Sequence, residues 1–94
     1  MNGVYVFVFE KDVDMTVVEQ NVALAIMSAE SYFGPAKVRM SLDYLRVEGK
    51  LGIDGSNEVG EFVARILTGF LISTGGEESF VVERIEDDGS ESDS

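Results

Sequence analysis

The chain has 94 residues, the size of one domain, and contains neither Cys nor His. These absences exclude disulfide bonds, thiolate metal sites and histidine general bases, so a bound metal would need oxygen ligands. The formal net charge is −11, with 7 basic residues against 18 acidic ones. This balance argues against nucleic-acid binding, which depends on Lys and Arg contacts with phosphates.

The first expected element is an uninterrupted apolar run at residues 4–9, rich in β-branched and aromatic side chains. A run this short predicts a strand that is buried on both faces and lies centrally in its sheet. A membrane span needs about 20 apolar residues and a signal core about 7–15, after a basic start that this chain lacks. We therefore expect a cytoplasmic protein that makes no use of a membrane.

A helix is expected next, between Thr16 and Phe33. Thr16 and Glu19 have the spacing of a capping box, in which each side chain pairs with a free backbone N–H of the other residue. Apolar residues then recur at steps of three and four, as one helix face requires: Val18, Val22, Ala25, Ile26, Ala29 and Phe33. Gly34 and Pro35 are expected to end the helix, since neither continues it readily.

Residues 37–54 predict a β-hairpin. Apolar residues alternate with polar ones along its first half, as in a half-buried strand: Val38, Met40, Leu42 and Tyr44. Glu48 and Gly49 can form a two-residue turn, in which Gly supplies the positive φ. This turn pairs Val47 with Lys50, Arg46 with Leu51 and Tyr44 with Ile53. The register leaves Leu45 and Val47 on the face opposite to the other apolar residues.

A second helix is expected to begin after Ser56 or Asn57, either of which can cap it, and to end at Gly75-Gly76. Its apolar stripe is continuous: Val59, Phe62, Val63, Ile66, Leu67, Phe70 and Leu71. Glu61 and Arg65 on its polar side are correctly ordered for an i,i+4 ion pair.

Residues 79–85 predict a last strand, which completes a single domain over residues 1–85. Residues 86–94 follow as an acidic tail that has nothing apolar to bury, and we expect them to be disordered. The tail holds five of the acidic residues, so the rest of the chain has a net charge of −6.

The predicted order is β-α-β-β-α-β, an α+β fold with two helices on one face of an antiparallel sheet. Short connections and right-handed crossovers favour the ferredoxin-like arrangement, with the hairpin of residues 37–54 at its centre. The alternative is a less regular α+β arrangement in which the first or the last strand pairs only marginally.

The open face of this sheet is the leading candidate for a functional surface. The first strand has no polar side, so either its aromatic set (Tyr5, Phe7 and Phe9) or its valine set (Val4, Val6 and Val8) must point away from the helices. Together with Leu45 and Val47, either set makes an exposed apolar patch of the kind that marks an interface. We take Tyr5, Phe7, Phe9, Leu45 and Val47 as interface candidates, for a homodimer or a protein partner. The alternative is a bulge near Tyr44 that turns Leu45 and Val47 inward, with the tail or a loop covering the remainder.

Three other features have plainer explanations. An RNA-binding sheet would need aromatic residues in its third strand, and residues 50–54 have none. Glycines around residues 54–58 could shape an anion or cation site, but turns and helix capping account for them. Asp12 and Asp14 precede the first helix, where its dipole favours carboxylates, and the sequence offers them no partner nucleophile.

The predicted element order resembles that of ACT-type regulatory modules, which bind amino acids near the loop between the first strand and first helix. Here that loop is residues 10–15, and it lacks the glycine that those modules place there. The whole chain also resembles the short acidic uncharacterised proteins of methanogenic archaea. That resemblance rests on its length, the Tyr32-Phe33-Gly34-Pro35 helix end and the acidic tail. It implies no function.

These observations favour a non-enzymatic interaction or assembly domain that uses the open sheet face. The alternative is a small-molecule-binding regulatory module, with its pocket near residues 10–15 or 54–58. We expect no catalytic residue, no cofactor and no metal, since the chain lacks the two side chains most used for these roles.

Overall fold

Four strands form an antiparallel sheet in the order β2-β3-β1-β4, so β1 and β3 are central and β2 and β4 are the edges. The structure, a computed structural model, describes residues 3–86. The strands are β1 (Gly3–Phe9), β2 (Tyr44–Val47), β3 (Lys50–Asp54) and β4 (Phe80–Glu86). The central position of β1 is the one predicted from its apolar sequence.

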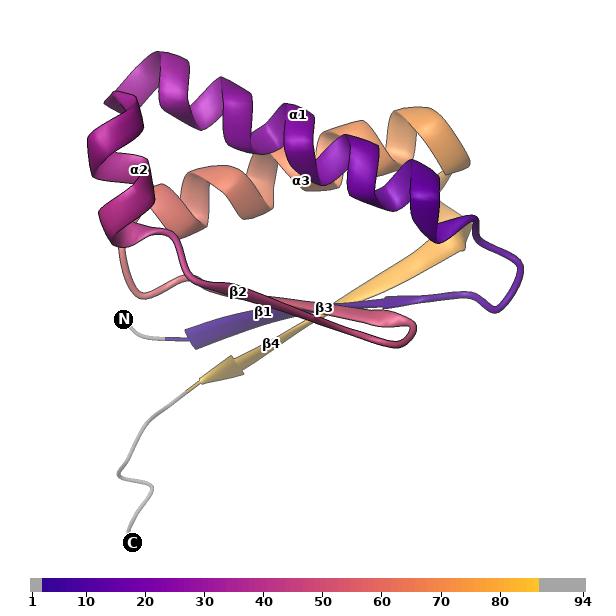
Figure 1. Cartoon of the computed structure of the whole chain (residues 1–94). Coiled ribbons are helices and arrows are strands. Elements are labelled where there is room, and N and C mark those ends of the chain that lie inside the picture. Colours follow the sequence, from indigo (N-terminus) through magenta and orange to yellow (C-terminus); the bar gives the residue numbers. More distant parts are fainter. Residues whose placement is uncertain (1–2, 87–94) are drawn as a thin grey trace, which may run out of the picture.

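Helices cover one face of this sheet (Figure 1). They are α1 (Met15–Phe33), α2 (Pro35–Ser41) and α3 (Glu58–Gly75), and the 3-10 turn η1 (Glu77–Ser79) leads into β4. Figure 1 shows α1 and α3 lying together above the strands, with α2 at one end, and none of the helices formed by residues 3–86 lies below. The fold is therefore α+β, with its helices on one side of an antiparallel sheet.

The core lies between the helices and the sheet. Its buried residues come from every strand except β2, and from all three helices: Phe7, Phe9, Val18, Val22, Ala25, Ala29, Val38, Leu51, Ile53, Val59, Val63, Ala64, Leu67, Leu71 and Phe80. The predicted helical stripes supply most of them. Burial of these side chains, at about 25 cal/mol per Å² of apolar surface, is the main stabilising contribution to the fold.

The hairpin has the predicted register. Val47 pairs with Lys50, Arg46 with Leu51 and Tyr44 with Ile53. Gly49 in the turn has a φ of 75°, a left-handed value that glycine adopts without strain. The pairing is continuous along β2, so there is no bulge at Tyr44.

The first half of the predicted hairpin is wrong, because residues 35–41 form the helix α2 and β2 begins only at Tyr44. Pro35 occupies the first turn of α2, where its missing N–H is not needed, so it starts this helix as well as ending α1. Val38 and Leu42 are four residues apart and share one side of a helix as readily as one side of a strand. Met40 distinguishes the helix from the strand. A strand would place it on the same buried face as Val38 and Leu42, but it is 86% exposed.

The start of α1 also differs from the prediction. Asp14 is the N-cap, and its Oδ1 accepts a hydrogen bond from the Thr16 N–H at 2.9 Å. The expected capping box of Thr16 and Glu19 is therefore absent, since Thr16 already lies inside the helix. Asp and Thr are both good caps, and the one that comes first in the chain is used here.

The last strand runs one residue beyond the predicted boundary, since Glu86 belongs to β4. The remainder of the predicted acidic tail, residues 87–94, lies outside the described residues.

Candidate functional site

The strand register divides the residues of the sheet between its two faces, because residues directly paired across a sheet point to the same side. We use "open face" for the side chains that point away from the helices. They form three rows across the sheet: Val47, Lys50, Val8 and Val81; Leu45, Gly52, Val6 and Glu83; and Asp54, Val4 and Ile85.

The aromatic set of β1 faces the helices. Phe7 is fully buried and Phe9 is 8% exposed, and both rings lie near Phe80 of β4. The Tyr5 hydroxyl lies 3.4 Å from Oε2 of Glu61 in α3. Phe7 and Phe9 are therefore core residues, and Tyr5 is partly buried against the core. These three interface candidates do not lie on the open face, where the valine set lies instead.

The valine set lies on the open face, where Val4, Val6 and Val8 are half-buried by the flanking strands. Aromatic rings have more apolar area to bury than valine side chains, which explains why the rings of β1 take the core side and the valines the other. No aromatic ring of β1 is available for base stacking on the open face, which removes the basis for an RNA-binding sheet.

Leu45 and Val47 lie where the hairpin register predicts, on the open face and well exposed, at 68% and 55%. Val81 and Ile85 of β4 extend the patch to the opposite edge, with exposures of 55% and 54%. These two residues were missed because their face depends on how β4 pairs with β1, which local alternation does not reveal. Val81 and Ile85 share one face of the predicted strand, but Glu83 between them breaks the apolar alternation.

A shallow groove of about 330 Å³ runs over Gly52, between β1 and β2. Its walls are the valines and the exposed residues of the hairpin, chiefly Val4, Val6, Leu45 and Val47, with Lys50 and Asp54 at its ends. The groove is present at Gly52 because glycine has no side chain to fill it. A Cβ added at Gly52 would meet Val4 at an ordinary distance of 3.7 Å.

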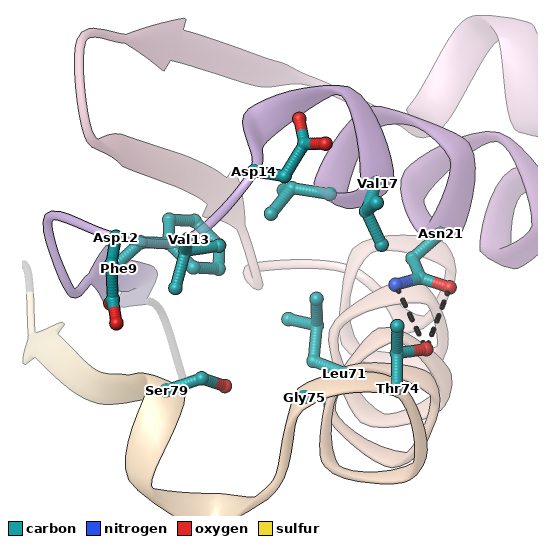
Figure 2. Close-up of a pocket in the computed structure, with 11 residues that line it drawn as sticks. Phe9, Asp12, Val13, Asp14, Val17, Asn21, Leu71, Thr74, Gly75 and Ser79 are labelled. Atoms are coloured by element: carbon teal, nitrogen blue, oxygen red, sulfur yellow. Dashed lines mark hydrogen bonds between the residues drawn. The ribbon is translucent and has the colours of Figure 1, made fainter.

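A second hollow, of about 310 Å³, opens between the loop after β1 and the end of α3 (Figure 2). Apolar side chains such as Val13, Val17 and Leu71 form its walls, and Asp12 and Ser79 lie at its rim. Figure 2 shows that the carboxylates of Asp12 and Asp14 do not point toward one another, and Asp14 is engaged in capping α1. They do not form an acid/base pair.

Asn21 is the polar side chain buried deepest in this hollow, at 6% exposure. Its Nδ2 donates to Thr74 Oγ1 at 3.3 Å, and the Thr74 hydroxyl lies 2.8 Å from the Phe70 carbonyl, to which it donates. A hydroxyl has one proton, so within residues 3–86 Asn21 Oδ1 has only the poorer contact to Thr74 at 3.5 Å. Residues 21 and 74 are too far apart in sequence for this pair to be predicted.

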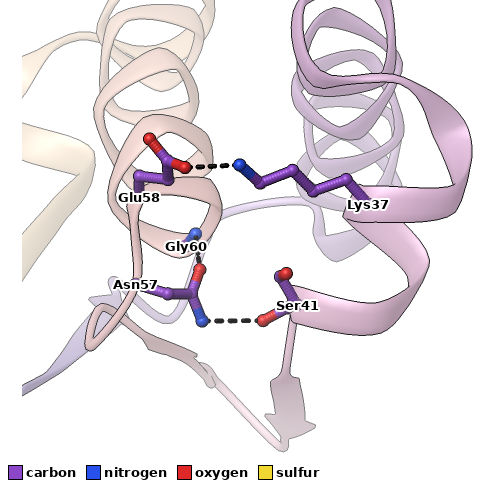
Figure 3. Close-up of polar contacts among 5 residues, drawn as sticks. All are labelled: Lys37, Ser41, Asn57, Glu58 and Gly60. Carbon is purple, nitrogen blue, oxygen red and sulfur yellow. Dashed lines mark hydrogen bonds and ion pairs between the residues drawn. The ribbon is translucent and has the colours of Figure 1, made fainter.

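Residues 54–58 serve as a structural junction, as expected from capping (Figure 3). Asn57 Oδ1 accepts from the Gly60 N–H at 2.9 Å, while Asn57 Nδ2 donates to the Ser41 carbonyl at 2.8 Å. Glu58 forms an ion pair with Lys37 of α2. The polar groups of this junction join α2 to α3, and the structure brings no ligand-binding cluster together here.

Among residues 3–86, no group of three His, Cys, Asp or Glu side chains is placed to hold a metal ion. Within the same range, none of the helices has the length and apolar character needed to cross a membrane.

Comparison of the chain with protein-family models, with curated proteins and with solved structures gave no significant match. The resemblance to methanogen proteins and to ACT-type modules therefore stays a prediction.

Proposed function

We propose that this protein is a non-enzymatic interaction or assembly module that binds protein through the open face of its sheet. The observation that carries the proposal is a mainly apolar surface that reaches all four strands, with Lys50, Asp54 and Glu83 as its charged residues. At its two edges Leu45, Val47, Val81 and Ile85 are each more than half exposed. Apolar patches of a few hundred Å² on a small domain usually mark an interface.

Physical chemistry supports this use of the surface. Burying apolar side chains contributes about 25 cal/mol per Å² removed from water, so a partner covering this face gains several kcal/mol gross. The patch also lies on regular strands, which hold it rigid and reduce the entropy lost on binding.

The proposal extends to the fold and the location of the protein. We propose a ferredoxin-like topology, supported by the all-antiparallel order β2-β3-β1-β4 and by two long helices that both cross the same face. We also propose a cytoplasmic location, supported by the acidic and cysteine-free composition.

Hydrophobic dye fluorescence at low protein concentration tests the surface directly, because any self-association is then dissociated. The wild type is expected to bind the dye, and Leu45→Asp and Val81→Asp are each expected to remove most of the signal. Met40→Asp is the matched control, since Met40 is 86% exposed but lies on α2, away from the sheet. Dye binding that is absent in the wild type, or unchanged by both open-face variants, would count against the proposal.

A second candidate function is a small-molecule regulatory module. It is favoured by the hollow beside residues 10–15 and by Asn21 Oδ1, which can accept a stronger hydrogen bond than its 3.5 Å contact to Thr74. The carboxylate of Asp12 and that amide oxygen are both acceptors, so the ligand class that fits is a small amine with an apolar body. A thermal-shift screen of amines tests it. The expected result is a rise in Tm for the wild type and none for Asn21→Leu, which fills the hollow; no shift with any amine contradicts this candidate.

A further inference from the structure

The open face carries two opposite charges on one strand. Lys50 and Asp54 are at the two ends of β3, with Gly52 between them, and all three point away from the helices. Alternate residues of a strand share a face, so the two charges are separated by four residues, or about 13 Å.

On β1 and β4 the apolar residues of the open face are arranged evenly about the row of Gly52, whereas Val47 of β2 has no apolar counterpart in the row of Asp54. The row through Lys50 holds Val8 and Val81, and the row through Asp54 holds their counterparts Val4 and Ile85. A half-turn that exchanges the two ends of β3 therefore places Val8 of one copy over Val4 of the other, and Val81 over Ile85. The same half-turn places the positive Lys50 over the negative Asp54. A symmetric dimer requires such a self-complementary surface, in which each residue meets its counterpart on the other copy.

We infer that the occupant of the open face is a second copy of this chain, docked so that Lys50 of each copy meets Asp54 of the other. The two-fold axis of this dimer lies between the two sheets, perpendicular to the strands, and passes over Gly52. This inference rests on the proposed function and names its partner.

The charges decide between the two symmetric ways of stacking these sheets. An axis parallel to the strands and midway between β1 and β3 would place Lys50 over Val8 and Asp54 over Val4, which buries two unpaired charges in each copy. An axis over β3 itself would place like charges on one another. The axis across the strands pairs them instead. An interfacial ion pair of this kind determines orientation more than it adds affinity, while the apolar rows supply the attraction.

The extent of the sheet sets the strength of the contact. Four strands spaced about 4.8 Å apart and about six residues long give a footprint of roughly 19 by 20 Å, or about 400 Å² per copy. Standard interfaces bury about 800 Å² per partner, so this contact is about half that size and falls among weak, transient associations. We therefore expect a reversible, concentration-dependent dimer.

One residue opposes this arrangement. Glu83 lies in the central row at the β4 edge, so the axis brings it near Glu83 of the other copy. Its exposed position allows water and salt to reduce the repulsion. Glu83→Gln is expected to lower the dimer Kd by a few-fold, and a higher Kd would contradict this orientation.

The decisive experiment is sedimentation equilibrium of the full chain with exchanged charges. Lys50→Glu and Asp54→Lys each replace two cross-dimer attractions with repulsions, and each is expected to raise the dimer Kd by roughly 30-fold or more. The Lys50→Glu/Asp54→Lys double variant restores both pairs and the wild-type Kd within a few-fold. An equimolar mixture of the two single variants also restores both pairs, and is expected to form a heterodimer at concentrations where each variant alone is mainly monomeric.

Asp54 Oδ1 also accepts from the Ser56 N–H at 3.0 Å, so Asp54→Lys affects a turn as well as a charge. Asp54→Asn keeps an acceptor at that position and is expected to weaken the dimer, while thermal unfolding at a concentration where the protein is monomeric stays unchanged. Single variants that dimerise like the wild type overturn the inference.

A wild type that stays monomeric at the highest concentration also overturns it. In that event the dye experiment separates the two proposals. If Leu45→Asp and Val81→Asp still remove dye binding, the face binds a different protein and only the second-copy inference fails.

Discussion

Gly60 and Gly69 both belong to α3, but their surroundings differ completely. A Cβ added at Gly60 would lie 1.8 Å from the Asp54 carbonyl oxygen, whereas at Gly69 it would meet nothing within 4 Å. Gly60 is thus needed for the close approach of α3 to the end of β3. Gly69 has no such role, and its flexibility only weakens the helix.

Alanine substitutions at these two positions are therefore expected to have opposite effects. Gly60→Ala should lower the free energy of unfolding by about 1–3 kcal/mol, since the helix or β3 must shift to admit the methyl group. Gly69→Ala should raise it by about 0.5–1 kcal/mol through helix propensity alone. Urea denaturation of both variants measures the contrast, and a shift of the same sign in both would show that the contact at Gly60 is not tight.

At the scale of elements, α2 is the segment whose structure most clearly departs from its local pattern. Val38 is 2% exposed and Met40 is 86% exposed, although both belong to the same alternating run. Val38→Ala should lower the free energy of unfolding by about 1–3 kcal/mol, through lost burial and a residual cavity. Met40→Ser should change it by less than about 0.5 kcal/mol. Equal losses at both positions, measured by denaturation, would instead fit the strand that the alternation predicts.

The same segment shows what local pattern can establish. The second half of the hairpin was predictable because its turn and its apolar residues independently require one register. Residues 37–43 were not, because positions 38 and 42 satisfy both periods, and only the packing of this segment against α1 and α3 distinguishes them. The same register places Leu45 and Val47 on the open face, so their position was predictable too. The sequence of β1 is apolar at every position, so it does not show which side of the strand faces the helices. The packing of Phe7 and Phe9 under the helices decides this.

At the scale of the whole molecule, net charge works against self-association. Each copy carries a formal charge of −11, so two copies repel one another at long range. Raising the ionic strength from about 0.01 M to about 0.15 M shortens the Debye length from about 30 Å to about 8 Å, which screens this repulsion more than the close Lys50–Asp54 contacts. The dimer Kd is therefore expected to fall as salt is added.

Sedimentation across a salt series measures this effect. The Lys50→Glu/Asp54→Lys double variant is the control, because it keeps the net charge of −11 and should show the same dependence. A Kd that rises with salt in both proteins would show that the local ion pairs outweigh the net charge.

The strand order also has a consequence for how the chain reaches this structure during synthesis. β1 emerges first and is the most apolar element, yet its two neighbours in the sheet are β3 and β4. One of its edges finds a partner only when residues 50–54 have been made, and the other only after residues 80–86. Until then its backbone N–H and C=O groups lack strand partners, and its valines have no flanking strands to bury them. β1 is central in the finished sheet, yet during synthesis it is the strand whose edges stay unpaired the longest.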